Sequence, residues 1–179
     1  LENGKESRAK NLDHSKKLAG VIDNQYYYED FEEWFCPLFD PYINAYINTV
    51  SGYKTDCFKN HPDWWKVDSL WINYQKPLEY NPPHFHDEDL SFVIFLQVPE
   101  EIVKENERTK GERRNGGPGM ICFDIGPNMP FSISSVGMMP KVKQTFIFPA
   151  WLTHYVNSFK SDVERISVSG NIIFKYDKI

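Results

Sequence analysis

The sequence predicts a mainly β fold, a sandwich or barrel of the jelly-roll type that is braced by N-terminal helices. From residue 68 onward, short apolar runs alternate with turn residues, which is the pattern of a sheet protein. Before that point, apolar residues recur at helical spacing. The 179 residues are 41% hydrophobic, which suits one core. We therefore expect a single domain over 1–179, mostly helical over 1–66 and β over 67–179.

The helical part is clearest between residues 29 and 50. Its regularly spaced apolar residues are Phe31, Phe35, Leu38, Tyr42, Tyr46 and Val50. Proline lacks a backbone N–H and clashes with the preceding helical turn, so Pro37 and Pro41 are expected to split this stretch. Asp40 would then cap a second helix that begins at Pro41.

The strands are predicted from short runs rich in β-branched and aromatic residues. They cover residues 69–75, 90–98, 119–125, 144–149 and 165–174, with weaker candidates at 131–136 and 155–159. Segment 90–98 is almost continuously apolar, as expected of a strand buried on both faces. The charged segment 100–119 is too polar for the core and is predicted to be a mobile surface loop. It would serve either as a lid that meets an acidic or peptide partner or simply as a solvated loop.

Composition argues against several classes of partner. The net charge is -5, with 20 basic and 25 acidic residues, so the chain has no nucleic-acid-binding footprint. No run is apolar enough to cross a bilayer, and the first residues do not resemble a signal peptide. The cysteines Cys36, Cys57 and Cys122 are far apart and odd in number, which favours buried thiols in a reducing compartment. A cytoplasmic protein without a membrane or nucleic-acid partner is therefore predicted.

Two histidines stand out in the segment NPPHFHDEDLSFVIFL. His84 and His86 occupy alternate positions, expected at the head of strand 90–98, so both imidazoles should point to one face. Two such nitrogens suit a borderline metal such as Fe(II) or Zn(II). The same pattern also fits an exposed polar strand end.

A third histidine and an arginine follow in order. His154 lies between two apolar strands, and Arg165 opens the last strand, where it should face the same side as Ser167. Burying a guanidinium is costly unless it has an anionic partner. A dicarboxylate would supply one through two parallel hydrogen bonds, and so would an Asp or Glu of the chain itself.

These residues, in this order, resemble the 2-oxoglutarate/Fe(II) oxygenase superfamily. The segments FPAWLTHYV and ERISVSGN, with PGMICFDIGP between them and the histidine pair, are similar to a group of small bacterial and phage oxygenases related to prolyl hydroxylases. The resemblance covers about residues 68–174. It implies a double-stranded β-helix with Fe(II) and 2-oxoglutarate as cofactors.

The resemblance also implies roles for individual residues. Arg165, assisted by Ser167, would hold the distal carboxylate of 2-oxoglutarate. Tyr74, ten residues before His84, stands where prolyl hydroxylases have a tyrosine that contacts this cosubstrate. A second family tyrosine would fall at Phe95, which lacks the hydroxyl.

The chain departs from the superfamily at one metal ligand. The usual carboxylate position is occupied by His86, so three neutral imidazoles would leave the full +2 charge on the metal. Glu88, paired with His86, or Asp87, beside His84, would restore a carboxylate. We favour His84, His86 and His154, because the smaller group also has H-x-H.

The function expected from this resemblance is an Fe(II)- and 2-oxoglutarate-dependent hydroxylase that uses O2. Its primary substrate is not specified, and a prolyl or other protein residue is suggested only by analogy. The alternatives are a cupin-type three-histidine dioxygenase that does not use 2-oxoglutarate, and a non-catalytic binding module of the same fold. Trp71, Phe148 and Trp151 are expected to pack in the core rather than to contact a substrate.

Overall fold

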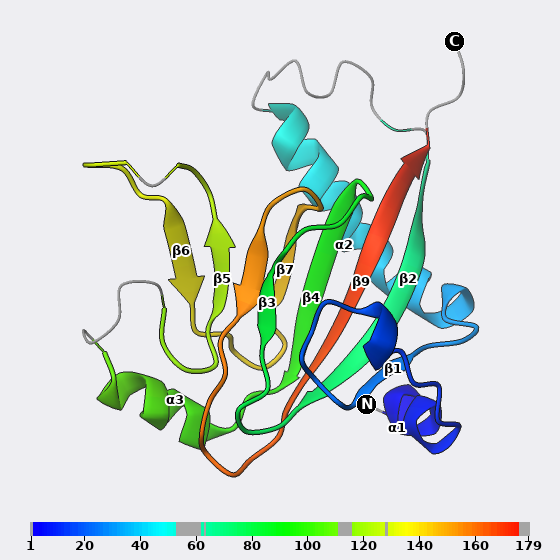
Figure 1. The fold of residues 1–179 in the computed structure, drawn as a ribbon. Helices are drawn as coiled ribbons and strands as arrows, with labels where there is room; N and C mark the ends of the chain where they lie inside the picture. The colour runs from blue at the N-terminus through cyan, green and yellow to red at the C-terminus, as the bar shows by residue number, and fades with distance from the viewer. Residues whose placement is uncertain (1, 53–61, 63, 111–115, 128, 176–179) are drawn as a thin grey trace.

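The computed structural model is built from two antiparallel sheets, which confirms the predicted jelly roll. The large sheet has the strand order β1-β2-β9-β4-β7, and the small sheet has the order β3-β8-β5-β6. Figure 1 shows the small sheet beside the large one, with helix α2 on the far side of the large sheet. The structure describes residues 2–52, 62, 64–110, 116–127 and 129–175.

The elements of the described residues follow one another in chain order. They are α1 (Glu2–Ala9), the 3-10 helix η1 (Ser15–Lys17), β1 (Gln25–Tyr27), α2 (Glu32–Gly52), β2 (Trp64–Gln75), β3 (Asn81–His84), β4 (Leu90–Gln97), α3 (Glu100–Arg108), β5 (Ile121–Asp124), β6 (Ser135–Met138), β7 (Thr145–Pro149), β8 (His154–Val156) and β9 (Arg165–Lys175). No helix of the described residues is long and apolar enough to span a membrane. Cys122 is buried and Cys36 partly buried, whereas Cys57 lies outside the described residues.

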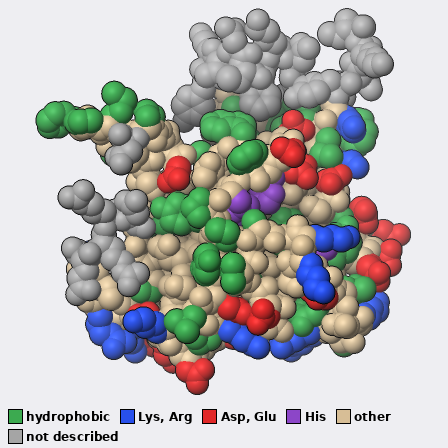
Figure 2. Space-filling model, in the orientation of Figure 1, with side chains coloured by type: hydrophobic (Ala, Val, Ile, Leu, Met, Phe, Trp, Pro, Cys, Tyr) green, Lys and Arg blue, Asp and Glu red, His purple; other side chains and the backbone are tan. Residues whose placement is uncertain are grey.

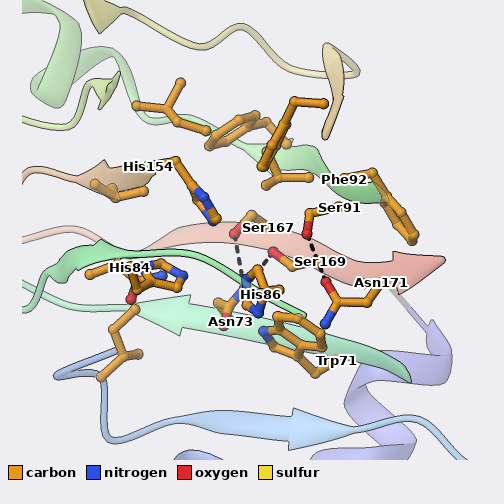
Figure 3. Close-up of a pocket in the computed structure, with 18 of the residues that line it drawn as sticks. Trp71, Asn73, His84, His86, Ser91, Phe92, His154, Ser167, Ser169 and Asn171 are labelled. Atoms are coloured by element: carbon orange, nitrogen blue, oxygen red, sulfur yellow. Dashed lines mark hydrogen bonds between the residues drawn. The ribbon is translucent and has the colours of Figure 1, made fainter. Parts of the chain in front are cut away.

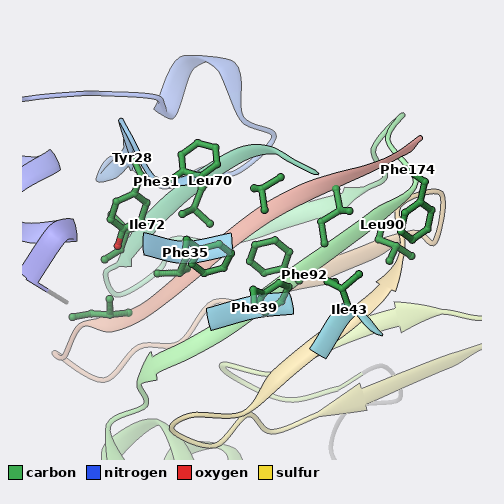
Figure 4. Packing of buried hydrophobic residues seen from close by; sticks show 14 of the residues in the cluster. Tyr28, Phe31, Phe35, Phe39, Ile43, Leu70, Ile72, Leu90, Phe92 and Phe174 are labelled. Carbon is green, nitrogen blue, oxygen red and sulfur yellow. The ribbon is translucent and has the colours of Figure 1, made fainter. Parts of the chain in front are cut away.

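Helix α2 is continuous, so the prediction that its prolines would split it was wrong. Each interior proline costs about 3 kcal/mol. A stripe of apolar residues spaced four apart is buried against the large sheet (Figure 4); Phe31 lies just before the helix, and Phe35, Phe39, Ile43 and Ile47 lie within it. Burying five such side chains contributes about 1.5–3 kcal/mol each, which outweighs the two prolines.

The other details of α2 follow from that stripe. Leu38 and Tyr42, which the sequence pattern placed on the buried face, are exposed. Asp40 lies inside the helix instead of capping one. Its carboxylate accepts hydrogen bonds from the Asn44 amide at 2.8 Å and the Trp65 indole at 3.1 Å.

The segment predicted as a mobile loop is helical in its first half, as α3, so that prediction was wrong there. Ile102 is fully buried. The carboxylate of Glu105 accepts the backbone N–H groups of Lys160 and Ser161 at 3.0 and 2.8 Å, which fixes α3 to the loop before β9. Hydrogen bonds to a charged acceptor are among the stronger ones. Residues 111–115 lie outside the described residues.

The histidine pair does not head strand β4, contrary to the prediction. His84 is the last residue of β3 in the small sheet, and residues 85–89 cross to β4 in the large sheet. The two strands therefore lie on opposite sides of the space between the sheets. Residues of β9 that face this space, Arg165 and Ser167, alternate with Ile166 and Val168, which pack in the α2 core.

Candidate metal centre

Three histidines meet between the two sheets (Figure 3). His84 and His154 are directly opposite each other on the paired strands β3 and β8. His86 follows two residues later, and its backbone N–H donates to the carbonyl of Ala150 at 2.9 Å. One ring nitrogen from each histidine lies within 4.8 Å of the other two, so all three could bind one ion.

Hydrogen bonds fix the orientation of two of the rings. The Nδ1 atom of His84 is 2.7 Å from the carbonyl oxygen of Pro82, and that of His154 is 2.9 Å from the carbonyl oxygen of Leu152. Because a carbonyl can only accept, Nδ1 carries the proton and donates it. The Nε2 lone pair of each ring is then available to a metal, an arrangement common among metal-binding histidines.

The three imidazoles are held in the neutral form that binds metal. Burial, which disfavours the charged ring, lowers the pKa of His84. Burial and the neighbouring His84 lower the pKa of His86 to about 4 and that of His154 to about 3. At neutral pH these nitrogens need not lose a proton before they bind.

The lowered pKa values predict that the metal-free protein becomes less stable as pH falls through about 6.5. The unfolded chain, whose histidines have ordinary pKa values, binds protons there while His86 and His154 stay neutral in the folded state. Each of these two rings should lower the unfolding free energy by about 1.4 kcal/mol between pH 7.5 and 5.5. Urea denaturation at several pH values measures this slope. His154→Gln should flatten it, and an unchanged slope would contradict the lowered pKa.

No carboxylate joins the three histidines among the described residues. Asp87 is exposed, and Glu88 is only partly buried. The carboxylate of the next residue, Asp89, accepts the backbone N–H of Phe174 at 2.7 Å. The structure thus brings the three histidines together, and neither Asp87 nor Glu88, the alternative ligands that the sequence allowed, joins them.

A buried arginine lines the same pocket. Arg165 is 3% exposed, and one of its Nη atoms donates to the carbonyl of Gly119 at 2.9 Å. Its Nε has no hydrogen-bond partner, and none of the described carboxylates lies within ion-pair distance. Burial lowers the pKa of the guanidinium to about 9. A buried cation without an anion is costly, so this site is suited to an anionic ligand.

A chain of polar side chains extends along the large sheet beside Arg165. The amide of Asn73 donates to the hydroxyls of Ser167 at 3.3 Å and Ser169 at 3.2 Å, and Gln25 donates to Asn73 at 2.7 Å. Sequence reasoning missed Asn73. The available signal was its alternation with Trp71 in an otherwise apolar strand, which places both on one face.

The structure does not bring Tyr74 into the site, in contrast to the prediction. Its side chain packs in the α2-facing core with Ile72 and Ile166, and Arg8 lies over its ring at 4.8 Å. Successive residues of a strand point to opposite faces, so it is Asn73 that faces the pocket. The side chain of Phe95, by contrast, lies 5.2 Å from the Arg165 guanidinium.

The aromatic residues divide between the pocket wall and the surface. Trp71 is buried and lines the pocket, with its ring 6.3 Å from that of His86. Phe148 packs edge-on against His154 at 4.7 Å. Trp151 is 70% exposed, so the prediction that it packs in the core was wrong.

One pocket contains both the three histidines and Arg165. It has an empty volume of about 530 Å³, which includes its opening to solvent. Histidine side chains reach the surface near the middle of the face in Figure 2. The ring nitrogens of the three histidines converge at one end of the pocket. The guanidinium of Arg165, which has an unpartnered Nε among the described residues, lies on the pocket wall.

Comparison with known families agrees with this chemistry. The model of the family described as "Putative 2OG-Fe(II) oxygenase" matches residues 69–171, more than half of the chain. The match includes all three histidines and Arg165. No curated protein matches the chain.

Several solved structures are similar to this chain at low sequence identity. The viral collagen prolyl hydroxylase of Paramecium bursaria Chlorella virus-1 aligns over 96% of this chain and 87% of its own, with 14% identity and a TM-score of 0.56. A Pseudomonas putida prolyl-4-hydroxylase aligns over 97% and 84%, with 13% identity and a TM-score of 0.51. A 2OG-Fe(II) oxygenase family oxidoreductase from Burkholderia pseudomallei aligns over 79% of this chain, with 14% identity and a TM-score of 0.49. This chain spans 55% of its length.

Proposed function

Because this chain belongs to the family of 2OG-Fe(II) oxygenases, whose cofactors are Fe(II) and 2-oxoglutarate, we propose that it is a hydroxylase in which His84, His86 and His154 bind the iron and Arg165 binds the cosubstrate. One observation carries the proposal. Three neutral imidazoles and a buried guanidinium, which has no carboxylate partner in the described part of the chain, line the same pocket.

The donor set fits iron(II). Imidazole nitrogen is a suitable ligand for this borderline metal, and three protein ligands leave positions open for other molecules. Three neutral rings leave the ion with its full +2 charge, so an anionic cosubstrate is attracted more strongly than it would be by a site that contains a carboxylate. The carbonyls of Pro82 and Leu152 hold two of the rings in the metal-binding tautomer.

The pocket wall fits 2-oxoglutarate. The Nε–H of Arg165 has no partner among the described residues, and a guanidinium binds a carboxylate through two parallel hydrogen bonds. The hydroxyl of Ser167, held by Asn73, is on the same face of β9 and would assist. Tyr74 has no part in this proposal, because its side chain faces the core.

The bound iron and cosubstrate supply the oxidising chemistry: 2-oxoglutarate, O2 and a substrate C–H give succinate, CO2 and a C–OH. The protein binds and orients the reactants and excludes water. Trp71, Phe95 and Phe148 make the pocket wall largely apolar, which limits competing reactions with solvent. The prolyl hydroxylases among the structural neighbours support a protein or peptide residue as the group that is oxidised.

The test is metal analysis combined with a titration of 2-oxoglutarate under anaerobic conditions. We expect one iron per chain and binding of 2-oxoglutarate that depends on the metal. After oxygen is admitted, succinate should form slowly even without the primary substrate, and it should be absent from a chelator-treated control. No cosubstrate binding and no succinate above that control would contradict the proposal.

A cupin-type dioxygenase is the second candidate, because the site lacks a carboxylate ligand among the described residues. That alternative has no specific need for an arginine on the pocket wall. It predicts iron binding without 2-oxoglutarate binding, so the same titration separates the two. A non-catalytic module would give neither succinate nor any other oxidised product.

A further inference from the structure

Three loops lie at the end of the small sheet that carries His84 and His154, and hydrogen bonds join them. Residues 85–89 contain His86, residues 150–153 lead into His154, and residues 125–127 and 129–134 are the described part of the connection between β5 and β6. Ala150 accepts the N–H of His86 at 2.9 Å and donates its own to the carbonyl of Asp89 at 3.1 Å. Thr153 accepts the N–H of Asp124 at 2.9 Å, which joins the third loop. We call these three loops the rim.

The rim exposes an unusual number of large apolar side chains. Six of the exposed large hydrophobic residues in the described part of the chain belong to it: Phe85, Ile125, Met129, Phe131, Ile133 and Trp151. Single exposed apolar residues are common, but a group of them on loops next to a candidate site marks a binding surface. Figure 2 shows hydrophobic side chains above and to the left of the histidines.

The backbone of the rim adds to this evidence. Phe131 has φ of +64°, in the left-handed region that bulky residues rarely adopt, and its side chain is fully exposed. Such a conformation costs of the order of 1 kcal/mol or more. Because the Phe131 side chain is exposed, no apolar burial within this chain offsets that cost. An exposed aromatic held in this way is suited to contact a partner.

The charged residues of the rim are all acidic. Asp87, Glu88 and Asp89 lie in its first loop and Asp124 at the base of its third, and the three loops contain no lysine or arginine. The carboxylate of Asp89 is used by the N–H of Phe174, whereas Asp87 and Glu88 form no ion pair with the described residues. Carboxylates beside an apolar surface favour a partner that has both basic and apolar side chains.

We propose that the rim docks a polypeptide segment with lysine or arginine among apolar residues, and that this segment is the primary substrate. This inference rests on the proposed function and names the substrate class. The apolar side chains are spread over three loops outside the pocket, so a small molecule held within the pocket would leave them uncovered. The carboxylates would repel an anionic lipid surface.

Binding of two peptide mixtures tests the proposal. Both are fluorescently labelled, about 12 residues long and alternate apolar residues with charged ones, Lys and Arg in one mixture and Asp and Glu in the other. Fluorescence anisotropy is measured on the protein loaded with 2-oxoglutarate and Mn(II), and on the metal-free protein. The basic mixture should bind roughly tenfold more tightly or better, and the difference should shrink as salt screens the charges.

Variants then assign the binding to the rim. Asp87→Asn with Glu88→Gln should remove most of the preference for the basic mixture. Trp151→Ala and Phe131→Ser should weaken both mixtures severalfold. Leu38→Ser is the matched control, because Leu38 on α2 is as exposed as Trp151 but distant in the fold, and it should change nothing. Thermal melting confirms that each variant is folded.

The inference would be overturned by equal binding of the two mixtures or by equal losses of binding in Trp151→Ala and Leu38→Ser. It would also be overturned if the rim bound a second copy of the chain, seen as self-association that Trp151→Ala abolishes, or if the protein bound phosphatidylcholine vesicles more tightly than peptide. Titration of 2-oxoglutarate on the same samples separates a failure of the substrate class from a failure of the proposed function. A wild type that binds 2-oxoglutarate but not the basic mixture contradicts only the substrate class, whereas absent 2-oxoglutarate binding contradicts the proposed function.

Discussion

Arg165→Ala is expected to weaken 2-oxoglutarate binding by roughly 30-fold or more while iron binding is retained. Arg165 is buried, one Nη atom donates to the carbonyl of Gly119, and its Nε–H has no partner among the described residues and is available to a carboxylate. Truncating one partner of a buried, charged hydrogen-bonded pair costs about 2–5 kcal/mol, a loss of roughly 30-fold or more in affinity. Isothermal titration with 2-oxoglutarate, beside metal analysis of the same sample, measures both quantities.

Two controls make this result specific. Arg165→Lys keeps the charge but loses the planar fork, so its affinity should fall between those of the wild type and the alanine variant. Arg108→Ala, on the exposed side of α3, should bind 2-oxoglutarate as the wild type does. If Arg165→Ala unfolds and 2-oxoglutarate does not raise the melting temperature of the wild type, then Arg165 has only a structural role.

His86→Ala is expected to reduce iron affinity by about a hundredfold or more, because removing a metal ligand costs at least as much as removing a residue that orients one. Glu88→Ala should leave iron bound, since the carboxylate is not among the converging ligand atoms. His86→Asp is informative as well, because it would introduce the carboxylate that the superfamily usually has. Iron per chain, measured after dialysis, provides the comparison, and His14→Ala serves as a histidine control outside the pocket.

The opposite pattern would assign the third ligand to Glu88. In that case Glu88→Ala would lose iron, and His84→Ala would be tolerated. A metal-bound structure would decide between nitrogen and oxygen at about 2.0–2.2 Å from the ion. This outcome would change the ligand set but not the role proposed for Arg165.

The sequence by itself predicted the candidate site. His84, His86, His154 and Arg165 were predicted from residue type and spacing together with the family resemblance, and the structure brings all four to one pocket. The common face of Arg165 and Ser167 followed from the two-residue period of a strand, and most strands could be placed within a few residues. These properties are local, so neighbouring residues are enough to predict them.

Tertiary structure decided what depends on residues far apart in the chain. Packing on the large sheet kept α2 continuous through Pro37 and Pro41, and the hydrogen bond from the backbone N–H of Ser161 to Glu105 fixed the position of α3. The pairing of Asn73 with Ser167, 94 residues later, placed Asn73 rather than Tyr74 at the site. Likewise, the rim arises only because β3, β5 and β8 are neighbours in one sheet. Strand pairing and burial, not local propensity, set these positions. The stabilising contacts join segments that are far apart in the sequence, so neither segment by itself predicts them.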